Sequence, residues 1–155
     1  MDEFNELLKK LDDAPEAEAG PPIGKVLVID DDPNIRQGLD KTLTRRNYEV
    51  VIAVTGDEGL ESLTADVCVV ILDVKMRGID GLTVYHRLKE RCPDIPIIFY
   101  SAYPGDEKVA QQCLALNPYA FIEKGVEADI DRLYTLIEKA AETFEPQTHT
   151  DGHRR

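Results

Sequence analysis

The stretch Val67-Cys-Val-Val-Ile-Leu-Asp73 constrains the fold of this chain more than any other. Six apolar residues, most of them β-branched, run without a polar break into one carboxylate. A strand with one wet face would alternate apolar and polar side chains, so this run predicts a strand buried on both faces, as in a parallel sheet covered by helices. Ligands of such sheets bind at the carboxyl ends of the strands, where Asp73 lies.

Short apolar runs and amphipathic stretches alternate along most of the remaining chain. The predicted strands are 25–29, 48–53, 67–72, 97–100 and 119–122, and the predicted helices are 34–46, 56–64, 82–91, 104–116 and 127–144. We expect Asn117-Pro118 to end the fourth of these helices, and the last to turn Ile130, Leu133, Leu136, Ile137 and Ala140 inward. Five strands alternating with five helices predict a three-layer α/β sandwich with a parallel sheet.

A chain of 155 residues suffices for one domain with short appendages, and we assign that domain to residues 23–144. Residues 1–22 form an acidic extension, in which Phe4, Leu7, Leu8 and Leu11 make one apolar stripe on a short predicted helix before a Pro/Gly/Ala linker. That stripe could cover the domain's own surface or dock a partner. Residues 145–155 lack periodicity, so we expect a disordered tail.

Charge and composition exclude several classes of function. The 30 acidic residues exceed the 18 basic ones, and a net charge of -12 argues against binding DNA or RNA. The three cysteines have no metal-binding spacing, which favours reduced thiols in a cytosol. No apolar run approaches the roughly 20 residues that span a bilayer, and the acidic start lacks the basic region of a signal peptide, so we expect a cytoplasmic protein without membrane insertion.

Polar residues follow four of the predicted strands: Asp30-Asp-Asp32, Asp73, Ser101 and Glu123-Lys124. If the sheet is doubly wound, these four strands are neighbours and the residues converge on one edge. Two carboxylates about 4 Å apart repel by roughly 4 kcal/mol at an effective dielectric near 20, so a cation is expected among them. Oxygen ligands without histidine favour Mg²⁺ or Mn²⁺ over zinc. A metal, a lysine and a hydroxyl around Asp73 would suit a phosphoryl group on that carboxylate.

Taken in order, the segments IDDDPNIR, ILDVKMRGIDG, FYSA and FIEKG resemble the receiver domain of two-component response regulators, over about residues 24–144. The resemblance implies a doubly wound, flavodoxin-like sheet of strand order 2-1-3-4-5. It also implies a signalling receiver rather than an enzyme, which takes a phosphoryl group from a histidine kinase or histidine phosphotransfer protein and promotes only its own phosphotransfer and autodephosphorylation. As no effector domain is recognisable, the chain looks like a stand-alone, chemotaxis-type receiver.

The same resemblance implies a role for each residue of a magnesium site. Asp73 would be the phosphoacceptor. Asp31 and Asp73 would bind Mg²⁺ through their side chains, the backbone carbonyl of Lys75 would be a third ligand, and Asp30 would act largely through a metal-bound water.

Further residues would stabilise and transmit phosphorylation. Lys124 would pair with the phosphoryl oxygens or Asp73, Ser101 would move to bond the phosphoryl group, and Phe121 would change rotamer in response. Lys75 and Tyr103 would flank the phosphoryl group and slow its hydrolysis. The output would be a switched protein-binding surface formed by the fourth predicted helix, the fifth strand and the fifth helix.

Simpler interpretations remain open. Asp32 could be only a helix N-cap, Lys124 a solvated lysine, Ser101 a turn cap and Phe121 a core residue. Two other functions are a degenerate receiver that docks without phosphorylation and a phosphohydrolase similar to haloacid dehalogenases, whose motifs Asp30-x-Asp32, Ser101 and Lys124 loosely match. Departures from the receiver pattern are Arg77-Gly78, Asn117-Pro-Tyr119 and Gly125, which replaces the usual proline.

Overall fold

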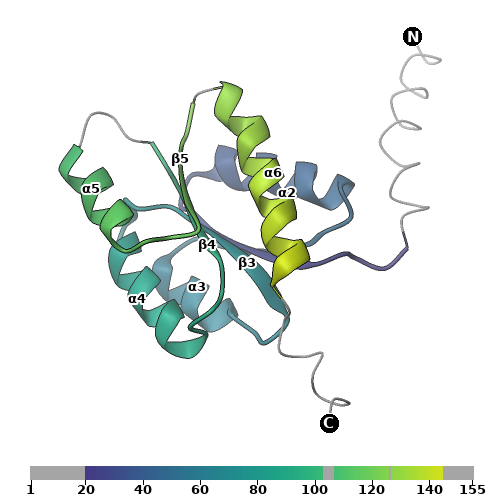
Figure 1. The fold of residues 1–155 in the computed structure, drawn as a ribbon, viewed down its shortest axis with the longest axis horizontal. Helices are drawn as coiled ribbons and strands as arrows, with labels where there is room; N and C mark the ends of the chain where they lie inside the picture. Colours follow the sequence, from purple (N-terminus) through teal and green to yellow (C-terminus); the bar gives the residue numbers. More distant parts are fainter. Residues whose placement is uncertain (1–19, 103–106, 126, 145–155) are drawn as a thin grey trace.

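The computed structural model describes residues 20–102, 107–125 and 127–144. In this part of the chain, five parallel strands form one sheet of order β2-β1-β3-β4-β5 (Figure 1). The strands are β1 (Lys25–Ile29), β2 (Glu49–Ala53), β3 (Val67–Leu72), β4 (Ile97–Ser101) and β5 (Ala120–Glu123). The predicted doubly wound order is confirmed, and it makes β1, β3, β4 and β5 consecutive neighbours.

Helices cover both faces of the sheet. They are α2 (Pro33–Arg45), α3 (Gly56–Ser62), α4 (Gly81–Arg91), α5 (Glu107–Ala115) and α6 (Glu127–Thr143). Helices α2 and α6 pack on one face and α3, α4 and α5 on the other, which gives the predicted three layers (Figure 1). The helix predicted within the N-terminal extension and the tail 145–155 lie outside the described residues.

Strand β3 lies at the centre of the core, and all six of its residues are buried. Val69 and Ile71 belong to the cluster that contains residues of α2 and α6, whereas Val70 and Leu72 belong to the cluster that contains residues of α3, α4 and α5. Burying one such side chain contributes about 1.5–3 kcal/mol, so β3 anchors both layers at once. This two-sided burial is what the unbroken apolar run predicted.

Several predicted element ends differ from the structure by one or two residues, and one side chain expected to be buried is exposed. Ile130 was expected to face inward but is 38% exposed. Strand β5 begins at Ala120 rather than Tyr119, and the Tyr119 side chain is 40% exposed. Asn117 does follow α5 in the left-handed conformation, with φ of 57°, as expected of a helix stop.

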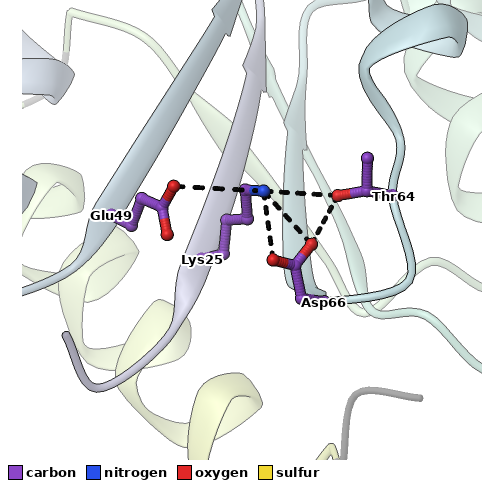
Figure 2. Close-up of polar contacts among 4 residues, drawn as sticks. All are labelled: Lys25, Glu49, Thr64 and Asp66. Atoms are coloured by element: carbon purple, nitrogen blue, oxygen red, sulfur yellow. Dashed lines mark hydrogen bonds and ion pairs between the residues drawn. The ribbon is translucent and has the colours of Figure 1, made fainter. Parts of the chain in front are cut away.

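A cluster of charged residues lies at the amino edge of the sheet, where β1, β2 and β3 begin (Figure 2). The Lys25 ammonium lies 3.1 Å from both carboxylate oxygens of Asp66 and 3.9 Å from Oε2 of Glu49. Thr64 donates its hydroxyl to Asp66 and approaches Lys25 at 3.4 Å. The pKa of Asp66 is lowered, chiefly by the Thr64 hydrogen bond and, against burial, by Lys25. This amino-edge cluster ties the starts of three strands together.

Candidate functional site

The ends of β1 and β3 fix two carboxylates side by side. The backbone N–H of Asp73 donates to the carbonyl of Ile29 at 2.9 Å, and that of Asp30 donates to the carbonyl of Ala53 at 3.1 Å. Each bond extends the pairing of the sheet one residue past the strand, so the backbone of Asp30 and Asp73 is held as firmly as the strands themselves. Both side chains are buried, with Asp30 2% and Asp73 5% exposed.

The loop after β1 turns back on its own carboxylate. The backbone N–H of Asp32 donates to Oδ1 of Asp30 at 2.9 Å, and the Arg36 guanidinium donates to the Asp30 carbonyl at 3.1 Å. Asp32 is the N-cap of α2 and accepts from the N–H of Asn34, which confirms the capping role expected for it. Asp31 lies between these two hydrogen-bonded residues, and its carboxylate does not cap α2.

A lysine from the end of β5 reaches both buried carboxylates. The Lys124 ammonium lies 2.8 Å from Oδ2 of Asp30 and 3.5 Å from Oδ1 of Asp73. Its own backbone N–H donates to the carbonyl of Ser101 at 2.8 Å, which ties the loop after β5 to the end of β4. The side chain of Lys124 is only 10% exposed, so water screens this pairing weakly.

Three carboxylates lie close to the Lys124 ammonium. One oxygen from each of Asp30, Asp31 and Asp73 lies within 4.8 Å of the other two. Burial, followed by the charge of Asp30, raises the pKa of Asp73 to about 6, and Lys124 opposes this shift only partly. Burial also raises the pKa of Asp30, although Lys124 and the N–H of Asp32 counteract it. The negative charge here is thus under-compensated.

A divalent cation fits this donor set. Carboxylate oxygens at such separations are the ligands that Mg²⁺ prefers, and Mg²⁺ commonly uses one or two protein carboxylates and keeps several waters. No histidine or cysteine joins the cluster among the described residues, which disfavours zinc. Bound Mg²⁺ would remove the repulsion that raises the pKa of Asp73.

The loop between β3 and α4 lies against the site and requires two glycines. A Cβ atom on Gly81 would lie 2.3 Å from the backbone oxygen of Asp73, so no other residue fits without moving that backbone. Gly78 has φ of +83°, a conformation that side chains disfavour. The N–H of Arg77 approaches Oδ2 of Asp31 at 3.4 Å and joins the loop to the acid pocket.

The other residues singled out from the sequence occupy varied environments. Ser101 is buried at the end of β4, and Lys75 is exposed two residues after Asp73. Phe121 is half-buried, with its ring centroid 6.3 Å from that of Phe99, which in turn stacks on Tyr85 at 5.3 Å. Tyr103 lies outside the described residues. The Lys124 ammonium pairs directly with the side chains of Asp30 and Asp73.

Sequence reasoning assigned no role to Arg36, although it lies within the motif IDDDPNIR. Side chains of a helix lean toward its N-terminus, so a long cationic side chain in the second turn of α2 can reach back over the preceding loop. That geometric signal could have suggested its contact with the Asp30 carbonyl. The contact holds the loop that presents Asp30 and Asp31.

The loop after Lys124 has a glycine, Gly125, where the receiver pattern has proline, and its backbone conformation differs from one that proline could adopt. Gly125 has φ of +85°, whereas proline is fixed near −65°. A proline at this position would require a different path for the loop, so the substitution noted in the sequence changes the local backbone and not only its rigidity. The paired ammonium of Lys124 nevertheless reaches Asp30 and Asp73.

Fold and site together define the receiver class of signalling domains: a doubly wound parallel sheet with acidic residues after β1 and β3 and a lysine after β5. The chain matches the family model of the response regulator receiver domain over residues 26–138. It belongs to the response regulator receiver family.

Individual relatives agree with this assignment. The C4-dicarboxylate transport transcriptional regulatory protein DctD of Rhizobium meliloti is 34% identical over 118 residues, which are 76% of this chain and 25% of DctD. The chain thus spans about a quarter of that relative. A receiver domain protein from Clostridium thermocellum superimposes with a TM-score of 0.68 and 29% identity, covering 77% of this chain and 94% of that one.

A second solved structure carries a ligand. The response regulator TrrA from Thermotoga maritima, in complex with Mg²⁺ and BeF, superimposes with a TM-score of 0.65 and 30% identity, covering 76% of this chain and 98% of that one.

In the part of the present chain that the structure describes, no helix is long and apolar enough to cross a membrane.

Proposed function

We propose that Asp73 accepts a phosphoryl group from a phosphohistidine on a partner histidine kinase or phosphotransfer protein. The observation that carries this proposal is the burial of Asp73 beside Asp30 and within 3.5 Å of the Lys124 ammonium. With a pKa of about 6, Asp73 is roughly nine-tenths ionised at pH 7 and can act as a nucleophile. Transfer from a cytoplasmic kinase would place the chain in the cytoplasm.

The proposed transfer balances without a further reactant. A carboxylate oxygen of Asp73 bonds to phosphorus as the phosphorus–nitrogen bond to the partner's imidazole breaks, and the imidazole keeps the electron pair and takes a proton. The ammonium of Lys124 neutralises charge on the phosphoryl oxygens, and Ser101 supplies a hydroxyl near them. Mg²⁺, when bound, supplies further charge neutralisation at the phosphoryl group.

The metal ligands follow from the acid pocket. We assign the side chains of Asp31 and Asp73 and the backbone carbonyl of Lys75 to Mg²⁺, with Asp30 acting largely through a metal-bound water. The same ion draws the carboxylates together, which otherwise repel. Mn²⁺ offers the same charge and oxygen preference and is expected to substitute.

Phosphorylation would then bias a protein-binding surface formed by α5, β5 and α6. Once Ser101 bonds the phosphoryl group, the space beside it becomes available to Phe121, whose half-buried ring already contacts the core cluster containing Phe99. A coupling of about 1–3 kcal/mol between the site and this surface would change partner affinity 5- to 150-fold. The output of the domain is therefore a protein contact, and its own dephosphorylation resets it.

The decisive experiment incubates the chain with Mg²⁺ and acetyl phosphate, or with beryllofluoride as a phosphoryl mimic. We expect one phosphoryl group per chain, no labelling in Asp73→Asn, and unchanged labelling in the matched control Asp66→Asn, whose carboxylate lies at the opposite edge of the sheet. Loss in Asp30→Asn with retention in Asp73→Asn would support the haloacid dehalogenase-like phosphohydrolase instead. No labelling of the wild-type chain would support the unphosphorylated docking module.

The lifetime of the phosphoryl group tests the modulating residues. Lys75 and Tyr103 each lie two residues after a site residue and would hinder the water that attacks in line with the phosphorus–oxygen bond. Lys75→Ala and Tyr103→Ala should each shorten the lifetime of labelled chain severalfold, with Lys89→Ala as a control remote from the site. An unchanged lifetime in both would refute this role.

A further inference from the structure

A pocket at the amino edge of the sheet is unused by the proposed phosphorylation chemistry. It has a volume of about 290 Å³ and is lined by Ile23, Leu43, Arg46, Tyr48, Tyr134 and Glu138. One water occupies roughly 30 Å³ in the liquid, so the pocket has room for a large apolar side chain. Most of its lining comes from α2, α6 and the residues just before β1 and β2.

The described chain begins at the rim of this pocket. The side-chain amide of Asn47 donates to the carbonyl of Pro21 at 2.9 Å, and the N–H of Ile23 donates to the carbonyl of Asn47 at 2.8 Å. These bonds fix the start of the described chain against the turn between α2 and β2. The Ile23 side chain is 59% exposed there, although it is apolar.

The charge at the carboxyl end of α2, on one side of the pocket, is opposite to that of the extension. Residues 41–46 contain three basic residues and no acidic one, and all three basic residues are exposed, in a chain whose net charge is -12. Residues 1–19 contain seven acidic and two basic residues, for a net charge of -5. Of the groups lining the pocket, Glu138 alone is acidic, and Arg46 lies 4.6 Å from the centre of the Tyr134 ring at the same place.

The length of the intervening chain permits a contact within one molecule. Eight residues lie between Leu11 and Gly20, and the nine Cα–Cα steps, at about 3.3–3.6 Å each, span at most about 32 Å. Tethering over so few residues gives an effective concentration on the order of millimolar, which favours even a weak intramolecular contact. A helix as short as 4–11 is marginal alone in water, so burial of its stripe would stabilise it.

We infer that the apolar stripe of the extension, Phe4, Leu7, Leu8 and Leu11, docks in cis on the pocket between α2 and α6. Ile23, which is exposed at the rim, receives the apolar side chains, and the basic end of α2 attracts the acidic segment. A protein partner whose contact surface includes α2 must displace the extension to bind. The extension would thus compete with such a partner for binding to α2.

Nuclear magnetic resonance of the full chain tests this docking. We expect nuclear Overhauser contacts between the stripe and Ile23, Leu43 or Tyr134, independent of protein concentration. Leu7→Asp with Leu8→Asp should lower the docked-to-undocked ratio at least about tenfold. Asn5→Asp with Lys9→Gln changes the net charge equally but leaves the stripe intact, so its ratio should stay within about twofold of wild type, measured at one ionic strength.

Each alternative occupant has its own signature. Contacts that grow with protein concentration, together with a dimer in sedimentation, would mean docking between two copies and would overturn the inference. Contacts with α5 or β5 instead of this pocket would overturn it as well, and so would an absence of contacts. Because the substitutions lie within residues 1–19, the spectrum of the remaining chain reports separately that the domain is folded, and phosphorylation of Asp73 is not involved in the result.

Discussion

The two edges of the sheet carry charged clusters that resemble each other in composition and differ in physical state. At the carboxyl edge, Lys124 pairs with carboxylates whose side chains are 2% and 6% exposed. At the amino edge, Lys25 pairs with carboxylates whose side chains are 54% and 41% exposed (Figure 2). The pKa of Asp73 is raised to about 6, whereas the pKa of Asp66 is lowered.

The opposite pKa shifts distinguish a site prepared for a ligand from a structural ion pair. Folding stabilises the charged form of Asp66 through a hydroxyl and an ammonium, so the amino-edge cluster is complete in itself. Folding disfavours the charged form of Asp73, because burial and the neighbouring Asp30 outweigh Lys124. A further positive charge bound at the carboxyl edge would therefore stabilise the charged form of Asp73.

Replacing each lysine by methionine gives the largest expected contrast. Lys124→Met leaves buried carboxylates without their cation, and breaking such a buried pair typically costs about 3–5 kcal/mol. Lys25→Met removes a pair exposed to water on its acidic side, which is worth about 0.2–1 kcal/mol. Urea unfolding at pH 7 in the presence of a chelator measures both losses. Equal losses would show that the two clusters are physically alike.

Removing one carboxylate at each edge should change stability in opposite directions. Asp73→Asn should raise the free energy of unfolding at pH 7 without metal by about 2–3 kcal/mol, because one pKa unit corresponds to about 1.36 kcal/mol and the pKa rises from 3.8 to about 6. Asp66→Asn should lower it by at most about 1 kcal/mol, since that pair is largely exposed.

The pH dependence fixes the sign of each effect. A carboxyl group with a raised pKa carries no penalty below its unfolded pKa, and the penalty grows as pH rises through the folded value. The gain from Asp73→Asn should therefore be absent below about pH 4 and complete above about pH 6. The loss from Asp66→Asn should behave oppositely, appearing above about pH 4 and vanishing as pH falls through its lowered pKa. Urea unfolding curves between pH 3 and 7 measure both effects. A gain in unfolding free energy from Asp73→Asn that does not change with pH would contradict this explanation.

The same contrast shows what the sequence can predict. The apolar run at 67–72 predicted the bounds of β3 correctly, because a strand buried on both faces can be identified from its own sequence. The approach of Asp30, Asp73 and Lys124 was predictable once four strand ends carried polar residues and the order of strands was inferred. By contrast, Lys25 and Asp66 are 41 residues apart and neither stands in a motif, so their pairing needed the register of β1 against β3.

Other details depended on tertiary contacts that no local pattern encodes. Helix α4 begins at Gly81, one residue earlier than predicted, because Asp80 caps it and Gly81 must pass close to the backbone of Asp73. The burial that raises the pKa of Asp73 comes from three layers packed around it. The exposure of Ile130 was likewise not predicted by the apolar period of α6. A one-dimensional apolar period carries neither kind of information.

Magnesium should stabilise only one of the two edges, and by less than the change expected from Asp73→Asn. A ligand that binds the folded chain adds about 1.4 kcal/mol when its concentration is ten times its dissociation constant. We expect wild type and Asp66→Asn to gain equally in 10 mM MgCl₂ at pH 7 over the same ionic strength of NaCl, and Asp73→Asn to gain far less. Below pH 6 protons compete for Asp73, so the gain of wild type should shrink. An equal gain in all three chains would mean that the ion binds away from the carboxyl edge.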